Sequence, residues 1–227
     1  MKDALTMMDL NQAIRSRRSV RGFLPRGIPE SVLREVFDLA QCAPSNCNVQ
    51  PWSPHLVSGQ SLRMLAEKMV GASLAGQAPN PDISADRIFA GIHKERQYDA
   101  ARQLYGAMGV DRYDRPGRDA AYRRNLDAFG APHAVFLFMS ADFGMREAVD
   151  IGIYSQTLML ALTSRGIGSC AQGALSLYPD IVRDHLGLAA DQKLLLGISF
   201  GYEDPSVPAN AARVGRASLA ETLVEHK

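Results

Sequence analysis

The sequence predicts one α+β domain over residues 1–227, and two patterns lead to that prediction. Strand-like and helix-like segments are mixed without the regular strand–helix–strand alternation of a doubly wound parallel sheet. The run IGIYSQTLMLALTS at 151–164 is apolar throughout, which predicts a helix buried inside the protein. It is too short for a membrane span, which needs about 20 residues. The chain, with 46% hydrophobic residues, is long enough to bury one core.

Two helices are expected in the N-terminal part. The first covers 8–16, after which Pro25 and Gly27 interrupt the chain. Pro29 then precedes the second helix, as proline commonly does at helix starts. The apolar residues of the second helix recur on one face, which predicts packing against a core: Val32, Leu33, Val36, Phe37 and Ala40.

The remaining core elements follow from apolar runs and their spacing. The expected strands are SPHLVSG (53–59), PHAVFLFMS (132–140) and KLLLGISFGY (193–202). The expected helices are 60–70, 145–165 and 178–186. The segment GSCAQGAL (168–175) contains glycine and is predicted to be a loop or a strand.

The stretch 71–131 differs in character from the rest of the chain. GASLAGQAPNPD at 71–82 predicts a loop, and polar helices are expected around 84–109 and 117–129. The many charges and the scattered aromatic residues indicate a helical excursion that covers part of the core, not a second domain. The tail after Pro205 predicts a short terminal helix or strand.

Charge and cysteine content narrow the functional classes. The chain has 25 basic and 24 acidic residues, so no overall field favours nucleic acid or an anionic membrane. The cysteines are odd in number (Cys42, Cys47 and Cys170), and the first ten residues lack a secretory apolar region, which predicts a cytoplasmic protein. Cys42 and Cys47 have no nearby histidine or third thiol, so no metal site is expected.

Positive charge is concentrated in the segment IRSRRSVRGF near the N-terminus. Four arginines occur there, and no acidic residue lies between Asp9 and Glu30. Three interpretations are open: a solvated surface, a patch for RNA or DNA, and a pocket for one small anion. Guanidinium groups bind phosphate through paired hydrogen bonds, and the hydroxyl of Ser19 adds a donor. Arg213 and Arg216, near the other end of the chain, are candidates for the same anion.

Motifs of acid–base catalysis and of nucleotide binding are absent from the sequence. No GxSxG, HExxH, phosphate-loop or GxGxxG signature occurs in its required context. His55 and His133 fall in predicted strands, where structural roles are expected. The loop PSNCNVQPW carries amides and a hydroxyl that suit the edge of a flat heterocycle, although turn formation would also explain Pro-Ser-Asn. Trp52 is expected in the core.

Six segments in order resemble the nitroreductase family of FMN-dependent oxidoreductases, and in particular its nitrobenzoate-reductase-like branch. They span nearly the whole chain: RRSVRGF, APSNCNVQPW, FGAPHAVFLF, RGIGSCAQGAL, LLLGISFGYED and NAARVGRASL. Each segment alone is a weak signal, whereas the ordered combination is specific. The resemblance implies a nitroreductase-like α+β fold, with a central, mostly antiparallel sheet flanked by helices, in an intertwined homodimer.

The resemblance also implies which residues bind FMN. By motif position they are Arg17, Arg18, Ser19, Arg21, Ser45, Asn46, Asn48, Gln50, Asn125, Gln172, Gly173 and Arg216. The N-terminal arginines, the adjacent serine and Arg216 are implied to hold the phosphate and ribityl chain, with Arg21 near the pyrimidine end of the ring. The loop residues are implied to line the flavin across the dimer interface. Gln172 and Gly173 match the stretch beside flavin N5, where many relatives have Glu-Gly.

The implied activity is reduction of nitroaromatic compounds to nitroso and hydroxylamine products with NADH or NADPH, by ping-pong hydride transfer. The flavin ring performs the redox step, so no catalytic side chain is expected. Phe89, Tyr98 and Tyr105 in the excursion are candidates for the substrate pocket, although packing on the core would explain each equally well. Quinone or enone reduction is the alternative on this fold. A non-enzymatic nucleotide- or RNA-binding module is a more distant alternative.

A homodimer is also expected from the apolar helix at 145–165. One side of a helix that is apolar all round packs on the sheet, and the other side needs a second cover. A second copy of the chain would supply that cover; the alternative is that the excursion at 71–131 folds over the helix. No nucleic acid or membrane partner is expected, because the overall charge is balanced and the apolar run is short.

Overall fold

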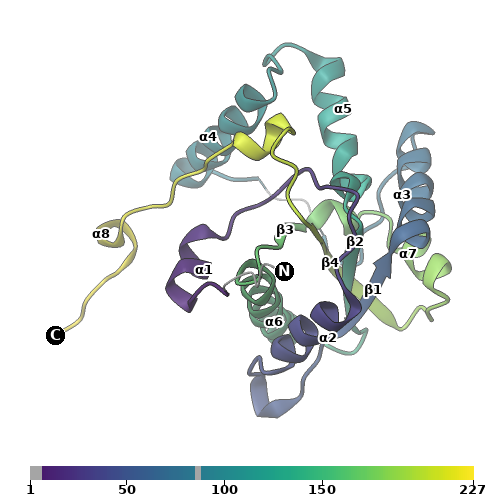
Figure 1. The fold of residues 1–227 in the computed structure, drawn as a ribbon, viewed down its shortest axis with the longest axis vertical. Coiled ribbons are helices and arrows are strands. Elements are labelled where there is room, and N and C mark those ends of the chain that lie inside the picture. Colours follow the sequence, from purple (N-terminus) through teal and green to yellow (C-terminus); the bar gives the residue numbers. More distant parts are fainter. Residues whose placement is uncertain (1–6, 85–87) are drawn as a thin grey trace, which may run out of the picture.

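The computed structural model describes residues 7–84 and 88–227, which fold around a four-stranded sheet (Figure 1). The strands lie in the order β1-β2-β4-β3, and each neighbouring pair is antiparallel. Their bounds are β1 Ser53–Ser58, β2 His133–Ser140, β3 Gly168–Gln172 and β4 Gln192–Gly201. The predicted α+β class with a mostly antiparallel sheet is confirmed.

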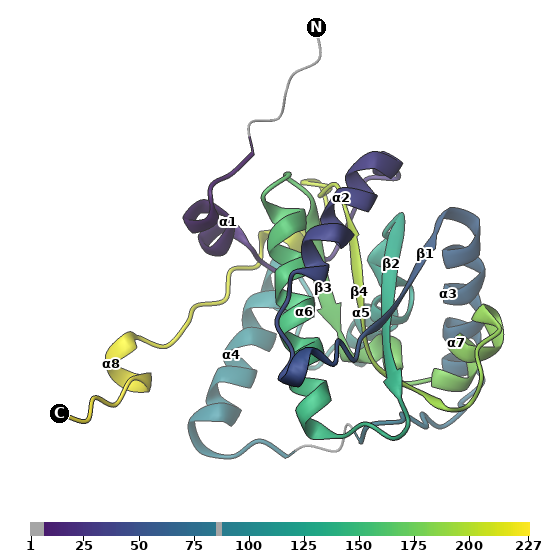
Figure 2. The ribbon, with the colours of Figure 1, turned by 90° about the horizontal axis from the view of Figure 1, so that it is seen from below.

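Helices cover both faces of the sheet (Figure 2). One face carries α2 (Glu30–Gln41) and α6 (Met145–Thr163), and the other carries α3 (Gly59–Leu74) and α7 (Pro179–Leu186). Strand β2 lies between the two layers, which explains why its sequence is apolar throughout. Its side chains alternate between the two cores: Val135, Leu137 and Met139 enter one, and Ala134, Phe136 and Phe138 enter the other.

The remaining helices lie outside these layers. They are α1 (Leu10–Ser16), α4 (Gly91–Ala107), α5 (Arg115–Leu126) and α8 (Leu219–Thr222). The 3₁₀ turns are η1 (Asn46–Asn48), η2 (Ala128–Gly130), η3 (Gly173–Ser176) and η4 (Pro208–Ala211). In Figure 1 the C-terminal tail with α8 extends away from the sheet. Among residues 7–84 and 88–227, no helix has the length and hydrophobicity that a membrane span requires.

Two helices begin or end away from their predicted positions. The helix expected at 60–70 continues to Leu74, so the first part of the predicted loop is helical. The helix expected from residue 84 begins at Gly91, and positions 85–87 of that prediction lie outside the described residues. Polar composition alone marks such boundaries poorly, because helical periodicity is weak when most side chains face solvent.

The bounds of α5 follow from local chemistry that the sequence pattern did not weigh. The prediction was 117–129, but the helix starts earlier, because Asp114 accepts the Gly117 N–H at 2.9 Å and caps the first turn. It ends earlier because Ala128 and Phe129 have φ of 47° and 57°, outside the right-handed helical region.

Helix α6 is not covered on every side within the single chain. Tyr154 and Leu158 are fully buried, but Met145, Val149 and Ile153 are 78%, 57% and 39% exposed. The single chain therefore does not bury the predicted helix on every side, and the described residues of the excursion leave this side of it exposed. The three exposed side chains recur every fourth residue and form one apolar stripe.

Candidate functional site

Residues 17–22, here called the arginine segment, are fastened to two parts of the core. The Val20 N–H donates to the Ser169 carbonyl in β3 at 3.0 Å. The Asp204 N–H, just after β4, donates to the Gly22 carbonyl at 3.1 Å. The segment therefore lies across the ends of two neighbouring strands, and its side chains are held at that edge of the sheet.

The guanidinium groups of the arginine segment fall into two classes. Arg18 forms an ion pair with Glu203. In the described part of the chain, Arg17 and Arg21 have no carboxylate partner within ion-pair distance. Two half-buried cations thus remain available to an external anion.

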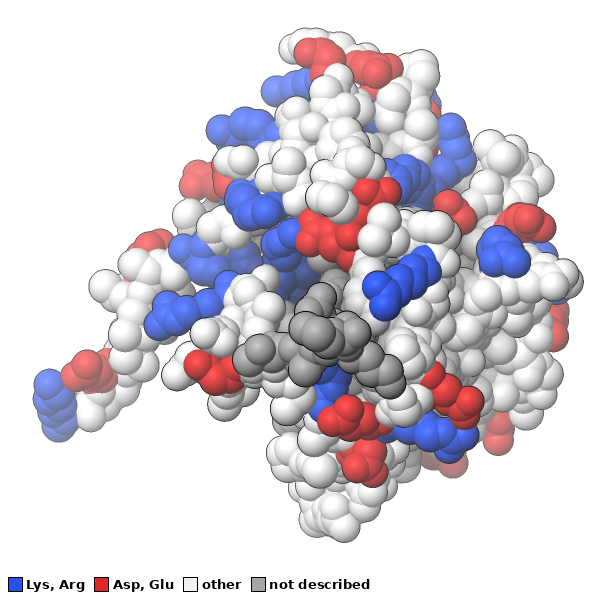
Figure 3. All heavy atoms as spheres, in the orientation of Figure 1, with Lys and Arg blue, Asp and Glu red and all other residues white. Residues whose placement is uncertain are grey.

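These two cations converge on one place. Burial raises the pKa of the Cys170 thiol, and the positive charges of Arg21 and Arg17, together with a hydrogen bond from Ser19, oppose that rise. The three side chains of the arginine segment therefore all lie near this thiol. In Figure 3, Lys and Arg side chains gather in a recessed area between α1 and η4.

A buried hydroxyl lies beside the arginine segment without a hydrogen-bond partner. Ser169 is 1% exposed, and its Oγ has no partner among the described residues. Ser19 forms a β-bridge with Ser169, so this hydroxyl belongs to the same edge. The donor set of guanidinium groups and hydroxyls fits a phosphate group.

The end of β3 offers an open surface next to this cluster. Gly173 is exposed, and a β-carbon built on it would have no heavy atom within 4 Å. The side chain of Gln172, in contrast, is 4% exposed and is used internally. It donates to the Asn125 carbonyl at 2.9 Å and accepts from Ser199 Oγ at 2.6 Å. Only the backbone at Gln172 and Gly173 remains available to a ligand on this surface.

Helix α5 ends beside the arginine segment. Arg124 donates from Nη2 to the Arg21 carbonyl at 3.2 Å. The side chain of Asn125 donates to the Tyr122 carbonyl at 3.1 Å. The α5 C-terminus thus adds a further cation and an amide to the edge that holds Arg17 and Arg21.

The polar loop after α2 is held in a strained conformation. Cys47, Asn48 and Gln50 have φ of 48°, 56° and 50°, in the left-handed region that side chains disfavour. Two contacts stabilise the loop. Asp150 in α6 accepts the Asn46 N–H at 3.1 Å, and Ser45 Oγ accepts the Gln50 N–H at 2.9 Å. The remaining polar groups of the loop are exposed.

Within one chain this loop does not reach the arginine segment. Asp150, which holds the loop, lies near the N-terminal end of α6, whereas β3, which holds the arginine segment, follows the C-terminal end. Figure 2 shows the loop at the lower end of α6 and α1 at the upper end. The single chain therefore brings together only part of the predicted cofactor-binding residues.

The C-terminal tail meets the arginine segment at Asn210, a contact that the sequence analysis missed. Asn210 Oδ1 accepts the Arg21 N–H at 2.7 Å. Arg213 donates to the Asn210 carbonyl at 2.7 Å. Arg216, the residue expected at the site, is exposed and donates to the carbonyls of Val214 and Gly215 in the tail itself.

The aromatic residues expected in the substrate pocket have little cover in the single chain. Phe89 is 42% exposed and Tyr98 is 58% exposed, with the Lys94 ammonium 5.6 Å from the Tyr98 ring centroid. Tyr105 is half-buried. None of these contacts assigns the three side chains to a pocket, so their role stays a prediction.

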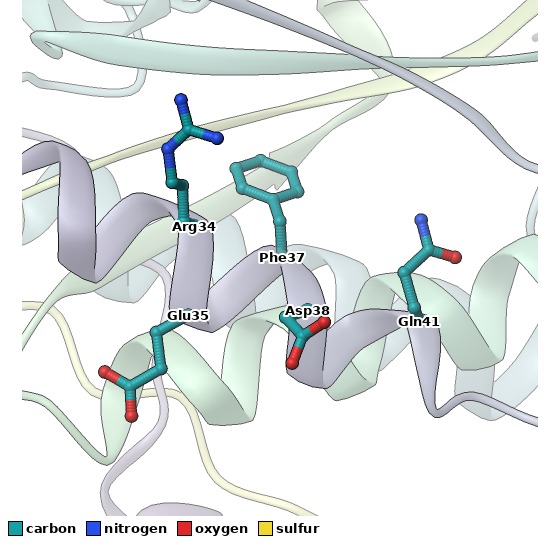
Figure 4. A pocket seen from close by; sticks show the side chains of 5 residues that line it. All are labelled: Arg34, Glu35, Phe37, Asp38 and Gln41. Atoms are coloured by element: carbon teal, nitrogen blue, oxygen red, sulfur yellow. The ribbon is translucent and has the colours of Figure 1, made fainter.

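Two open hollows include no residue of the arginine segment in their lining. One, of about 540 Å³, is lined by Arg34, Glu35, Phe37, Asp38 and Gln41, all from α2. Figure 4 shows Arg34, Phe37 and Gln41 extending to one side of the helix, and Glu35 and Asp38 to the other. The other hollow, of about 530 Å³, is lined by Met8, Gln12, Arg15 and Ser16 at α1. Each is a single helix surface, not an enclosed cavity.

The chemistry available at the arginine segment is binding, not acid–base catalysis. Within residues 7–84 and 88–227, no group of three His, Cys, Asp or Glu side chains is arranged to hold a metal ion. The two buried or half-buried histidines in strands serve the fold: His133 accepts the Ile28 N–H at 3.0 Å, and His55 lies 3.1 Å from Ser53 Oγ. The expected structural roles fit these contacts.

Three functional candidates were missed because their sequence context is ordinary. Ser169 is one serine in a short strand, Arg124 is one of many charged residues in a polar helix, and Asn210 lies in a Pro-Ala-Asn-Ala turn. Each reaches the arginine segment only through the tertiary fold. No local pattern distinguishes them, and only the clustering of NAARVGR near the C-terminus hinted at a contact.

Comparison with known proteins gives a consistent result. Residues 14–202 match the family model described as the nitroreductase family. The chain is 43% identical over 219 residues to nitroreductase NfnB of Mycolicibacterium smegmatis, covering 95% of this chain and 93% of that protein. It is 34% identical to a 4-nitrobenzoate reductase of Pseudomonas putida, covering 94% and 93%.

A solved structure supports the same comparison. The FMN-dependent nitroreductase NfnB from Mycobacterium smegmatis, determined in complex with NADPH, superimposes with a TM-score of 0.92 at 42% identity. The alignment covers 96% of this chain and 97% of that one. Fold and sequence thus agree over almost the full length of both chains.

Proposed function

The chain belongs to the nitroreductase family, and from this premise we propose that it is an FMN-dependent oxidoreductase that reduces nitroaromatic compounds with NADPH or NADH. The single observation that carries the proposal is that the arginine segment lies against β3 beside the buried, unpartnered hydroxyl of Ser169, while no carboxylate of the described chain neutralises the half-buried guanidinium groups of Arg17 and Arg21. Such a cluster suits a phosphate group.

The residues at this edge fit the cofactor part by part. Arg17 and Ser19 hold the phosphate, and Arg18, paired with Glu203, keeps the arginine segment in place. Arg216 would reach the phosphate only if the tail folds back on binding, since its guanidinium contacts only tail carbonyls. Arg21 lies toward the pyrimidine end of the ring. The open backbone at Gly173 and the end of α5 at Asn125 accept the flat ring, because no side chain fills the space above Gly173.

Bound FMN would supply the redox chemistry, which is hydride transfer from the nicotinamide to the nitro compound. The protein binds and orients the cofactor, and water supplies protons, so no acid–base side chain is required. Reductant and oxidant use the same face in turn, which gives ping-pong kinetics. The excursion at 71–131, with Phe89, Tyr98 and Tyr105, forms the cover under which the substrate binds.

The working unit of this proposal is a homodimer. The stripe Met145, Val149 and Ile153 on α6 is apolar and exposed, and α1 exposes Leu10 at 66% and Ile14 at 51%. Surfaces of this kind mark interfaces between chains. The loop residues Ser45, Asn46, Asn48 and Gln50 lie at the far end of α6 from their own arginine segment, so the partner's loop completes each site.

The test uses the purified protein and a panel of oxidants. It is expected to carry a yellow flavin whose absorbance is bleached by NADPH without oxygen, and nitroaromatic compounds are expected to restore the colour faster than quinones, enones or oxygen. Faster reoxidation by quinones or enones would move the assignment to that alternative. A colourless protein that FMN does not reconstitute would refute the proposal.

A further inference from the structure

Asn210 uses its whole side chain to join the two ends of the polypeptide. It lies in η4 and is 4% exposed. Its Oδ1 accepts the Arg21 N–H at 2.7 Å, and its Nδ2 donates to the Gly22 carbonyl at 2.8 Å and to the Asp204 carbonyl at 2.9 Å. Both amide hydrogens and the amide oxygen are engaged, so the side chain fixes the backbone of the arginine segment against the turn after β4.

The main-chain carbonyl of Asn210 accepts hydrogen bonds from two guanidinium groups. Arg18 donates to it from Nη1 at 3.4 Å, and Arg213 donates from Nη1 at 2.7 Å. Because both groups contact one oxygen atom, the C-terminal arginine lies directly beside the N-terminal segment. One residue therefore sets the relative position of cations far apart in the sequence.

The two guanidinium groups at this carbonyl differ in charge balance. Arg18 is neutralised by Glu203. Arg213 contacts only carbonyl oxygens, those of Asn210 and Ala212, and has no carboxylate partner in the described part of the chain. Its guanidinium is exposed and retains donors for a ligand. It adds an uncompensated positive charge at the edge where Arg17 and Arg21 converge.

We propose that Asn210 is a positioning residue of the phosphate site, and that Arg213 is a further guanidinium of that site, held in place by the Asn210 carbonyl. The inference rests on the proposed FMN-binding function. Asn210 does not contact the phosphate; it determines whether the cations from both ends of the chain contact it together.

A purely structural role for Asn210 makes a different prediction. Loss of a buried hydrogen-bonded amide destabilises any fold, and a general loosening weakens all ligands of the site alike. A positioning role affects only the part of the ligand that the cations contact. FMN and riboflavin differ in the phosphate alone, so the ratio of their dissociation constants isolates that part.

The experiment measures FMN and riboflavin binding to flavin-depleted full-length protein by fluorescence quenching. Asn210→Ala is expected to reduce the preference for FMN over riboflavin about tenfold or more, because charge-assisted contacts of about 1.4 kcal/mol or more are lost. Arg213→Ala is expected to fold, because the side chain is exposed and contacts only carbonyl oxygens. It is expected to lower the preference in the same way and tests the idea if Asn210→Ala does not fold.

Arg183→Met is the matched control. Arg183 is also a buried hydrogen-bonding centre, contacting Asp82, Asp180 and the Gln192 carbonyl, but it lies on α7. Its replacement is expected to lower the melting temperature and leave the FMN-to-riboflavin ratio unchanged. An unchanged ratio in Asn210→Ala or in Arg213→Ala would overturn the inference while leaving FMN binding itself intact. Failure of the unaltered protein to bind either flavin would instead refute the proposed function.

Discussion

Arg17 and Arg18 are neighbours in sequence with different surroundings. The guanidinium of Arg18 is held by Glu203 and by the Asn210 carbonyl. That of Arg17 has no carboxylate partner in the described chain and contributes its charge next to Cys170. The first arrangement stabilises the protein's own fold, and the second leaves a cation for a ligand.

Replacing each arginine by alanine separates these roles. Arg17→Ala is expected to raise the FMN dissociation constant about 10- to 100-fold, because hydrogen bonds to charged groups contribute about 1.5–3 kcal/mol, with little change in unfolding free energy. Arg18→Ala is expected to lower the unfolding free energy by about 1 kcal/mol, since its ion pair is only partly exposed. Flavin titration and urea denaturation measure the two effects. An unchanged FMN affinity in Arg17→Ala would contradict the assignment.

His133 makes stability depend on pH. Its Nε2 accepts the Ile28 N–H, its Nδ1 lies 2.7 Å from Ser58 Oγ, and burial lowers its pKa below 6.5. In acid the unfolded chain then binds more protons at His133 than the folded chain does. The contribution of His133 to the unfolding free energy is therefore complete above pH 6.5 and is lost as the pH falls through the lowered pKa.

Urea denaturation between pH 5 and pH 8 checks this expectation. His133→Gln keeps an acceptor for the Ile28 N–H but does not titrate, so it is expected to show a shallower loss of stability in acid. Burial also lowers the pKa of His55, so part of the slope remains in the variant. Identical slopes for the two proteins would exclude His133 as a contributor.

At the residue scale, the sequence identified charges but not their partners. The arginine segment stood out because its cations are contiguous. Which of them is neutralised depends on Glu203, which follows β4 and reaches Arg18 only because the fold brings the two ends of the chain together. Gln172 shows the converse: its motif position pointed to the cofactor, yet its side chain is engaged by Asn125 and Ser199.

At the element scale, close packing fixes the arginine segment. A β-carbon on Gly22 would lie 2.5 Å from Val207 Cγ1, so glycine is the residue that lets the segment lie against the turn after β4. A side chain at this position would force the arginine segment and the turn after β4 apart.

The same substitution at two glycines is expected to have opposite effects. Gly22→Ala is expected to lower the unfolding free energy by about 1–3 kcal/mol through overpacking, and to weaken FMN binding. Gly106→Ala, in the exposed helix α4 with no heavy atom within 4 Å of its built β-carbon, is expected to raise it by up to about 1 kcal/mol. Urea denaturation of both variants provides the check, and a shift of the same sign in both would contradict the packing argument.

The elements most accurately predicted from sequence are those that pack against the core. Strands β2 and β4 have long apolar runs, and α2 has one apolar face, so their existence followed directly from periodicity. The excursion was located less accurately. None of the described side chains of α4 is fully buried, so no core pattern marks where that helix begins.

At the scale of the whole molecule, exposed apolar surface supports the proposed homodimer. The α6 stripe has no cover in the described chain, and Leu219 and Leu223 in the tail are 70% and 52% exposed. Sequence alone left open whether the excursion or a second chain covers α6. The described residues of the excursion leave the α6 stripe exposed, which favours a second chain.

Charge placed on the α6 stripe is expected to separate the proposed homodimer. Val149→Glu would bury one unpaired carboxylate per chain, two in a symmetric dimer, which raises the dimer dissociation constant about 100-fold or more. Met64→Glu, on the equally exposed α3, is the control and is expected to remain dimeric. Sedimentation velocity distinguishes the two; a dimeric Val149→Glu would show that the interface lies on another face.

The distance between the polar loop and the arginine segment, at opposite ends of α6, has a genetic consequence. Suppose that, in the proposed homodimer, one chain carries a defective arginine segment and the other a defective loop. A mixed pair then concentrates both lesions in one active centre and leaves the other wholly intact. Two inactive alleles would restore activity when co-expressed, whereas either allele alone would give inactive enzyme.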